Sequence, residues 1–519
     1  MAATALTDLF EGSMSSDTEP DARLLTALSR NTSANDLSRL SGPLKRVGSL
    51  ESMHETLASD GRPELIRRLS SAGIERLPDR QMIANAVSKF ARQQPPPTVY
   101  PGDEQGHFFT TPWNWALVDG VAVTATPGAY AKVAWRGGAP DGVVEIGIDN
   151  SESPDAAFMT VRFTLDGMGE AFSVGVPPRD HEPRIRVSVD SLLGVERSPL
   201  TERRTLTIGV QNSRQSIDRW GDESEGRLPT GSLRIKWIRL PAGSIPSRPI
   251  LQPRRLLVYG DSIVEGVGAD YRKGSSGDLQ ANVGLSTWAS YLATNLKCEL
   301  SSVGYGRLGW SIQGNGNVPP FPSSWDKVFA GVPRSFGSDG SSKPPDIIMI
   351  NLGTNDGLIT GAASCEALTS HVQEWLTKQR AAVGPTTHII VCVPFGGFGA
   401  NRPPVNMLSQ AFDEYQETSG GDKNCHLIDL GEDAALHLTG FRFKEGTGEL
   451  DSTPESADGL HPTRARHAQL AQMLRKRIEI VLDESRVLAG DGELAGEALL
   501  LRAPSVDCMI AMGDALNLS

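Results

Sequence analysis

The sequence has few cysteines and no long apolar run. Its 519 residues include five cysteines, which lie far apart and form no Cys-x-x-Cys pair. An odd number of scattered cysteines predicts reduced thiols rather than a disulfide framework. No apolar stretch approaches the roughly 20 residues that a bilayer-spanning helix needs. The amino terminus has no basic segment and meets acidic residues early, so we expect no secretory signal and a cytoplasmic protein.

Several functional motifs are missing as well. No His-Glu-x-x-His occurs, and His461 and His467 are badly spaced to share a metal ion, so we expect neither a metal nor another cofactor. His467 falls on the last predicted helix, and we expect it on the surface. No Gly-x-Ser-x-Gly occurs, which argues against the common α/β-hydrolase turn. The net charge of −12 argues against a nucleic-acid partner held through its phosphates.

The chain is longer than one typical domain, and its character changes along its length. Residues 1–62 are rich in polar residues without sustained periodicity, which predicts disorder. Residues 63–94 carry apolar residues at helical spacing on either side of Gly73 and Pro78, which predicts a small helical hairpin. Two interpretations of this hairpin stay open: a docking or oligomerisation module, and an arm that packs on the main body.

Residues 98–242 show the alternation of apolar and polar residues that is typical of strands. Glycine, proline and aspartate punctuate the runs, which predicts an all-β, jelly-roll-like sandwich. Tryptophans in this part permit two interpretations, stacking on a sugar ring or packing in the core, and the core is the more common place for them. The residues concerned are Trp113, Trp115, Trp135 and Trp220.

Short apolar runs alternate with helical patterns over residues 254–482. The first run, Leu256 to Tyr259, stops at Gly260, and four similar runs follow it. Five short strands with crossovers predict an α/β domain in which helices cover both faces of a parallel sheet. Residues 483–519 form a C-terminal tail whose role the sequence does not indicate.

Polar motifs follow these strands, at the edge where open α/β sheets bind their ligands. Gly260-Asp261-Ser262 follows the first strand, and Gly353-Thr-Asn355-Asp356 follows the third. Asp458-x-x-His461 stands before the last helix. Ser262 by itself could simply cap a helix. Together, however, these are the groups that acyl transfer needs: an attacking serine, a histidine that carries its proton and an aspartate that orients the histidine.

A glycine-rich segment, Gly304-x-Gly306-x-x-Gly309, follows the second strand. Its spacing fits a dinucleotide-binding fingerprint, but the residues after it cannot begin the helix that such a site requires. The alternative is a backbone N–H that stabilises an oxyanion together with the Asn355 amide, each donor contributing on the order of 3 kcal/mol in the transition state. We expect Asp356 to fix a loop rather than to act as a second catalytic acid.

The four motifs, in this order, resemble those of the SGNH (GDSL) hydrolase superfamily over residues 254–482. The resemblance implies a three-layer, flavodoxin-like fold, with Ser262 as nucleophile, His461 as base and Asp458 as its partner. It also implies an oxyanion hole made by the Ser262 N–H, a glycine N–H and the Asn355 side chain. Gly309 is the preferred glycine because it precedes Trp310-Ser311, and Gly306 is the alternative.

A β-sandwich in front of such a domain is similar to the architecture of two-domain carbohydrate esterases. The resemblance therefore implies a serine esterase that acts on short acyl esters, with O-acetyl groups of a carbohydrate as the expected substrate. An acyltransferase, or a lipid or thioester hydrolase, would use the same site. A non-catalytic binding or scaffold protein is the alternative of another class, although the complete set of site residues argues against it.

Overall fold

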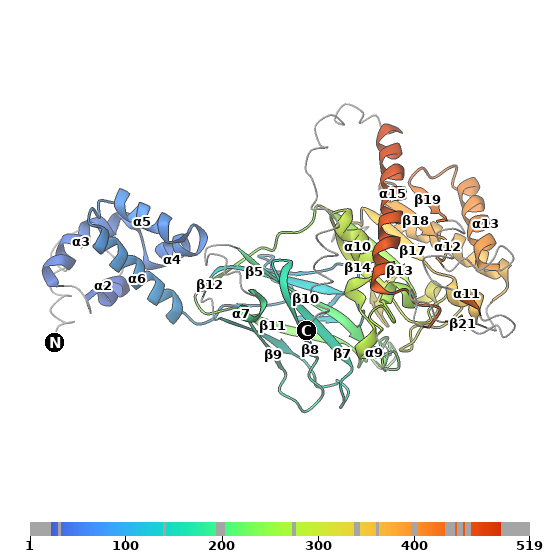
Figure 1. Cartoon of the computed structure of the whole chain (residues 1–519), viewed down its shortest axis with the longest axis horizontal. Helices are drawn as coiled ribbons and strands as arrows, with labels where there is room; N and C mark the ends of the chain where they lie inside the picture. The colour runs from blue at the N-terminus through green and yellow to red at the C-terminus, as the bar shows by residue number, and fades with distance from the viewer. Residues whose placement is uncertain are drawn as a thin grey trace.

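The computed structural model describes residues 22–29, 33–138, 142–193, 203–271, 277–336, 343–359, 363–395, 403–430, 442–443, 450–451 and 458–488. Three units follow one another along the length of the molecule: a group of helices, a pair of antiparallel sheets and an α/β unit (Figure 1). None of the helices in these described ranges is long and apolar enough to cross a membrane.

The N-terminal unit consists of short helices with a leucine-rich core. They are α2 (Ala22–Ser29), α3 (Ala34–Val47), α4 (Leu50–Ser59), α5 (Gly61–Ser71) and α6 (Leu77–Gln93). The prediction of disorder up to residue 62 is therefore wrong from Ala22 onward, and residues 1–21 lie outside the described residues. The predicted hairpin over 63–94 corresponds to α5 and α6, which are part of this larger unit.

Two serines explain why the polar composition was misleading. Ser33 and Ser49 are N-caps, and their side chains accept hydrogen bonds from Asp36 N and Ser52 N respectively. They separate α2, α3 and α4, and each of these helices buries leucines in one shared cluster. Helix α4 contacts strands β5 and β12 of the next unit, and His54 Nε2 lies 3.0 Å from Gly243 O.

The middle unit contains two sheets whose strand pairs are all antiparallel. One sheet has the order β3 (Ala116–Val118), β4 (Val121–Thr124), β11 (Leu233–Arg239), β6 (Val143–Ile148), β9 (Arg184–Ser188), and β1 (Thr98–Val99) pairs with β11. The other has the order β12 (Ser244–Ser247), β5 (Tyr130–Gly137), β10 (Arg204–Ser213), β7 (Met159–Leu165), β8 (Met168–Gly175), and β2 (Phe108–Thr110) pairs with β5. The predicted alternation over β7 is confirmed, since every second side chain is buried. The jelly-roll-like connectivity stays a prediction.

All four tryptophans of this unit are buried, with exposed fractions of 0% for Trp113, 5% for Trp115, 2% for Trp135 and 7% for Trp220. Trp115 and Trp135 belong to the core between the two sheets. Trp113 and Trp220 belong to a cluster that also contains Tyr259 and Trp310 of the α/β unit. These residues are therefore core, and the interpretation that they present a flat face to a sugar is wrong.

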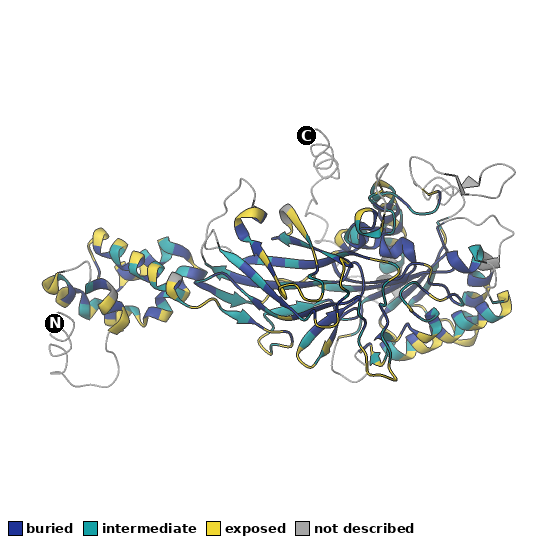
Figure 2. Cartoon of the chain, turned by 90° about the horizontal axis from the view of Figure 1, so that it is seen from below, coloured by how far each residue is buried: buried dark blue, intermediate teal, exposed yellow. Residues whose placement is uncertain are grey.

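The α/β unit contains the predicted five-stranded parallel sheet. Its strand order is β14 (Cys298–Gly304), β13 (Arg254–Gly260), β17 (Ile347–Asn351), β18 (His388–Cys392), β19 (Cys425–Ile428), with parallel pairing throughout. This is the flavodoxin-like order in which the second strand lies outside the first. Strands β14 and β17 are buried along their whole length. Figure 2 shows that buried residues, in dark blue, fill the interior of the β and α/β units.

Helices cover both faces of this sheet because its apolar side chains alternate between them. Leu257 and Tyr259 of β13 face a cluster that includes residues of α12 (Cys365–Val383) and α13 (Pro403–Thr418). Leu256 and Val258 face the opposite cluster, with residues of α10 (Trp288–Asn295) and α15 (Arg464–Leu488). Helix α15 extends six residues beyond the predicted boundary at 482, and the tail from residue 489 lies outside the described residues.

Trp113 offers a test of how the two sheets are fastened to the α/β unit. Its Nε1 donates to Ser335 O at 2.9 Å, and Arg334 Nε donates to Trp113 O at 2.7 Å. We expect Trp113→Ala to lower the free energy of unfolding by about 3–5 kcal/mol, because it empties a packed, fully buried site. Urea unfolding measures this change. Leu117→Ala, at a side chain that is 57% exposed on β3, should cost less than about 1 kcal/mol. Equal losses would contradict the packing role.

Candidate active site

Three strands of the parallel sheet end at the same level, and this register brings the sequence motifs together. Gly260 at the end of β13 is paired with Gly304 of β14 and with Asn351 of β17. Each strand therefore delivers its following motif to one edge of the sheet. After β13 the chain turns into a short helix, α8 (Ser262–Glu265), which begins at Ser262. Asp261 caps this helix by accepting a hydrogen bond from Ile263 N at 2.9 Å.

Ser262, His461 and Asp458 form a continuous chain of hydrogen bonds. His461 Nε2 lies 2.8 Å from Ser262 Oγ, and His461 Nδ1 lies 2.5 Å from Asp458 Oδ2. Asp458 Oδ1 accepts from the backbone N–H groups of Leu460 and His461, at 2.9 and 2.8 Å. The Asp-x-x-His spacing allows this arrangement because both residues belong to one tight turn before α15.

The electrostatic surroundings keep the Asp458 carboxylate ionised. Its partial burial would raise the pKa, but hydrogen bonds from the His461 ring, the charge of that ring and the two backbone N–H groups outweigh burial and hold the pKa of Asp458 well below its usual range. An ionised Asp458 accepts the Nδ1 proton of His461, which leaves Nε2 as an acceptor toward Ser262. The assignment of the tautomer follows from this partner.

Asn355 and Asp356 lie on α11 (Thr354–Leu358), directly after β17. One hydrogen of the Asn355 amide is donated to Leu308 O at 2.9 Å, which orients the amide and leaves its second hydrogen for another acceptor. Asp356 accepts from Trp310 N and Ser311 N, each at 2.8 Å. The expectation that Asp356 fixes a loop is confirmed, since both bonds hold the segment after β14.

Neither of the two glycines considered as oxyanion donors, Gly309 and Gly306, has a free backbone N–H. Gly309 N donates to Ile312 O at 2.9 Å, and Gly306 N donates to Glu265 Oε2 at 2.5 Å. A Cβ on Gly309 would lie 2.5 Å from Asp356 Oδ2, so this glycine is needed for close packing within the loop. The expectation that Gly309 supplies an oxyanion N–H is therefore not met in this arrangement, and the fallback Gly306 is engaged as well.

The prediction that His467 lies on the surface is wrong. It is fully buried on α15, and its Nδ1 accepts a hydrogen bond from Trp288 N at 3.1 Å. Burial, together with the nearby His461, lowers the pKa of His467 to about 3, so the ring is neutral. Its neighbours on α10 lie far away in sequence, which is why the helical pattern alone gave no signal of this role.

Asp261 carries a buried carboxyl group beside the serine. It is 0% exposed, and Ile263 N donates to its Oδ1. Burial raises the pKa of Asp261 to about 6, against the opposing effects of the Ile263 N–H bond, the charge of His461 and the Thr354 hydroxyl.

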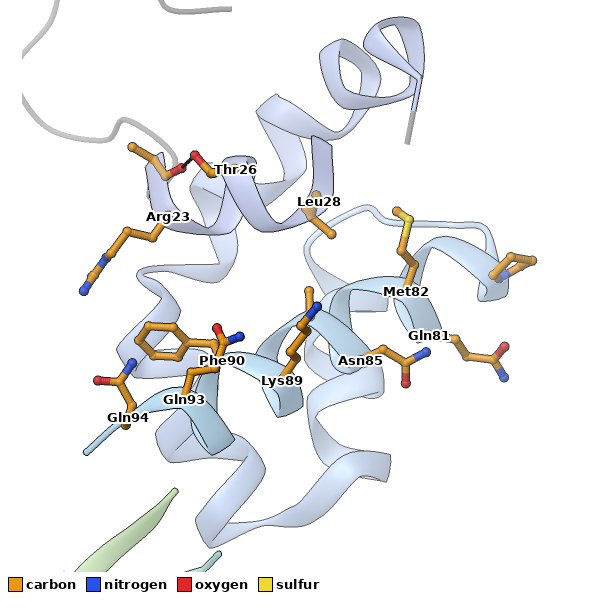
Figure 3. A pocket seen from close by; sticks show the side chains of 13 residues that line it. Arg23, Thr26, Leu28, Gln81, Met82, Asn85, Lys89, Phe90, Gln93 and Gln94 are labelled. Carbon is orange, nitrogen blue, oxygen red and sulfur yellow. Dashed lines mark hydrogen bonds between the residues drawn. The ribbon is translucent and has the colours of Figure 1, made fainter. Parts of the chain in front are cut away.

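No ligand cluster suited to a metal occurs in the described part of the chain, where no three or more His, Cys, Asp or Glu side chains are so arranged. The one pocket shown, in Figure 3, lies in the helical unit and is lined by side chains of α2 and α6 such as Arg23, Met82 and Phe90. It is therefore separate from Ser262.

A flavodoxin-like sheet with a serine, histidine and aspartate hydrogen-bonded at its carboxyl edge defines a serine hydrolase type of site. Comparison with known proteins agrees with this class. Residues 258–469 match the model of the GDSL-like lipase/acylhydrolase family. This domain is an SGNH (GDSL) hydrolase, and the protein is an enzyme that acts on ester bonds.

Solved structures share the fold at low sequence identity. A family two carbohydrate esterase from Cellvibrio japonicus is 13% identical, with a TM-score of 0.53, covering 75% of this chain and 98% of its own. An acetyl xylan esterase from the rumen bacterium Butyrivibrio proteoclasticus is 16% identical, with a TM-score of 0.53. The match covers 77% of this chain and 100% of the esterase chain. A carbohydrate esterase family 2 enzyme plus carbohydrate binding domain from Corynascus thermopiles (Myceliophthora fergusii) is 17% identical, with a TM-score of 0.50. The match covers 75% of this chain and 100% of that chain. No curated protein sequence matches the chain.

The buried Asp261 predicts a pH-dependent cost to stability. Because the folded pKa of Asp261, about 6, lies above the ordinary aspartate value of 3.8, the unfolded chain loses this proton first as the pH rises. The folded state is therefore penalised progressively between about pH 4 and pH 6, and fully above that, by at most about 3 kcal/mol. Asp261→Asn keeps an oxygen for Ile263 N and removes the penalty.

We expect Asp261→Asn to be more stable than the wild type at pH 8 by about 1–3 kcal/mol, and the difference to shrink toward pH 4. Urea unfolding at pH 4, 6 and 8 measures it. Asp155→Asn, which removes a carboxylate that is 85% exposed, is the matched control for loss of charge. A difference between Asp261→Asn and wild type that stayed constant across this range would show that burial is not its cause.

Proposed function

We propose that the protein is a serine esterase that removes short acyl groups, with O-acetyl groups on a carbohydrate as the substrate class. The observation that carries the proposal is the unbroken hydrogen-bond chain from Asp458 through His461 to Ser262. The nucleophile, the base and the group that orients the base all lie within hydrogen-bond distance, as nucleophilic catalysis by serine requires.

The reaction follows from these contacts. Ser262 Oγ attacks the acyl carbon while His461 Nε2 takes its proton, and the carbonyl oxygen becomes an oxyanion. As the tetrahedral intermediate collapses, His461 gives the proton to the leaving alcohol, and an acyl group remains on Ser262. Water then attacks this acyl-enzyme with His461 again accepting the proton, and the acid is released with Ser262 restored. The Asp458 carboxylate stabilises the imidazolium that forms in both halves.

Two groups serve as oxyanion donors in this proposal. The Ser262 N–H lies at the start of α8 and has no acceptor among the described residues, and the second Asn355 amide hydrogen is not used by Leu308 O. Each such donor contributes on the order of 3 kcal/mol to the transition state. The glycines of the second motif hold the neighbouring loop instead, Gly309 through Ile312 O and Gly306 through Glu265.

The proposal that a carbohydrate supplies the alcohol part of the ester is supported by the fold shared with carbohydrate esterases. It is not drawn from the side chains around Ser262. The similarity covers three quarters of this chain, so it extends beyond the α/β unit into the antiparallel sheets. We propose that these sheets, residues 98–242, and the hydrolase domain, residues 254–482, act together as one two-domain esterase.

The nucleophile and base are tested together. Ser262→Ala and His461→Ala should each lower kcat on p-nitrophenyl acetate by several orders of magnitude, because the two side chains act as one unit. Asp458→Asn should cost less, because the asparagine oxygen can still accept from His461 Nδ1 although the negative charge is lost. A fluorophosphonate probe followed by peptide mass spectrometry should mark Ser262 alone.

His467→Ala is the control for the base, since it removes the other histidine of this region. It should destabilise the packing of α10 on α15 while leaving kcat on p-nitrophenyl acetate within about tenfold of wild type. Retained activity in Ser262→Ala, or modification of a different serine, would refute the assignment and favour a non-catalytic role for this domain.

Substrate class is tested with a panel of esters. We expect kcat/KM to fall from p-nitrophenyl acetate to butyrate to octanoate, and acetylated xylo-oligosaccharide to release acetate, measured by an enzyme-coupled assay. Preference for octanoate would favour a lipid hydrolase instead. Adding a second alcohol at high concentration separates hydrolysis from transfer: a new ester forming faster than free acetate would identify an acyltransferase.

A further inference from the structure

Glu265 is a buried carboxylate in the same short helix as the proposed nucleophile. It lies three residues after Ser262 at the end of α8, and it is 0% exposed. A charge in such a place is costly unless other groups pair with it and satisfy its lone pairs. The chemistry proposed for Ser262 and His461 uses no second carboxylate of this kind, so its presence needs another reason.

The partners of Glu265 come from the preceding β unit. Arg219, whose side chain is also 0% exposed, donates from Nη1 to Glu265 Oε1 at 2.5 Å. Gln215 donates from Nε2 to the same oxygen at 2.7 Å. Both residues belong to residues 214–220, which follow β10 and which we call the bridging loop. The bridging loop thus reaches across the domain boundary to the helix that begins with Ser262.

The second oxygen of Glu265 holds the segment after β14. Glu265 Oε2 accepts the Gly306 N–H, and the bridging loop binds the same segment: Asn315 Nδ2 donates to Gln215 Oε1 at 2.8 Å, and Arg219 Nη2 donates to Asn315 O at 3.2 Å. A Cβ on Gly306 would lie 2.0 Å from Gln215 Oε1. A side chain at 306 would therefore displace the Gln215 and Asn315 side chains from the hydrogen bond that joins them.

We propose that Glu265 and Arg219 are positioning residues, which set the relative placement of Ser262 and of the segment that orients Asn355. Leu308, two residues after Gly306, accepts the hydrogen bond that orients the Asn355 amide. The carboxylate of Glu265 therefore couples α8, which carries Ser262, to the turn that aims Asn355. This inference rests on the function proposed above and assigns the β unit a direct part in it: the bridging loop completes the catalytic geometry.

Glu265→Gln is the sharpest test because it preserves the shape and removes the charge. A glutamine has one acceptor oxygen and a donor NH₂, so it cannot accept from both Arg219 and Gly306 N. We expect kcat on p-nitrophenyl acetate to fall by about 10- to 100-fold while KM stays within about threefold, since loss of transition-state alignment lowers kcat. Arg219→Lys, which keeps a charge but loses the guanidinium contact with Asn315, should give a smaller loss in the same direction.

A second ion pair between the same two units supplies the control. Lys132 of β5 pairs with Glu299 of β14 at 2.7 Å, and Glu299 is also largely buried. Glu299 lies five residues before Gly304 on the same strand, about 17 Å from the site edge at ~3.3 Å per residue. Lys132→Met breaks an equivalent contact between the units, and its kcat should remain within about twofold of wild type.

The outcomes separate this inference from the proposed function. A wild type without esterase activity and without fluorophosphonate labelling of Ser262 would refute the proposed function. An active wild type whose kcat is unchanged in Glu265→Gln would overturn only the positioning role, and so would an equal loss of kcat in Lys132→Met. Thermal unfolding checks each variant. If Glu265→Gln does not fold, the double variant Arg219→Met with Glu265→Met replaces both charges by apolar groups of similar size.

The double variant should fold and still lose kcat by about 10-fold or more, because the link to Gly306 N is gone. Full activity in that variant would overturn the proposal. Failure of every variant to fold would overturn it as well, because the buried pair would then serve stability of the chain rather than alignment of the site.

Discussion

The level ends of three parallel strands are the constraint on which the site depends. Gly260, Gly304 and Asn351 are paired across β14, β13 and β17, so the residues that follow them are delivered to one edge of the sheet. A shift of this register would separate Ser262 from Asn355 by at least one residue step of about 3.3 Å. Burial of the strands on both faces makes such a shift costly, because every apolar side chain would leave its cluster.

Around this edge the protein buries carboxyl groups at some cost to stability. Asp261 has an elevated pKa because it is fully buried, whereas Asp458, which is more exposed, has a depressed pKa because its partners favour the charged form. Glu265 is also fully buried, and it is paired with Arg219, Gln215 and Gly306 N. The pKa values of Asp261 and Asp458 thus shift in opposite directions because their burial and hydrogen bonds differ. Shifted pKa values of this kind are typical of functional sites, where the positions of the reacting groups are kept at a cost to the stability of the fold.

The sequence predicted those parts that depend on local pattern. The strand ending at Gly260, the five-stranded sheet and the contact of His461 with Ser262 and Asp458 all followed from periodicity and from motifs at strand ends. Helices α2 and α4 were missed because they have only 8 and 10 residues, and α3 was missed because Gly42 and Pro43 interrupt its leucine pattern. Their shared core forms only when they pack together, which composition does not reveal.

Contacts between segments that lie far apart in the sequence could not be predicted either, because no local pattern marks the two partners. Arg219 and Glu265 are 46 positions apart, and neither carries a local signature of its partner. Gly306 was considered as part of a dinucleotide fingerprint and as an oxyanion donor, whereas in the structure its N–H binds Glu265 and its Cα faces Gln215 of another unit. The burial of His467 likewise depends on Trp288 of a separate helix. A pattern along one chain segment cannot show which other segment will approach it.

The boundary between the β unit and the α/β unit is mainly apolar in one part and mainly polar in another. Trp113, Trp220 and their neighbours make a largely apolar junction, to which hydrogen bonds of Trp113 with Ser335 O and Arg334 are added. Near Ser262 the contacts are polar and directional, from Gln215 and Arg219 to Glu265 and Asn315. Apolar packing supplies most of the association energy because it scales with area, whereas hydrogen bonds to a buried charge fix angles and distances. The separation of these two roles allows one interface both to hold the units together and to align the residues proposed for catalysis.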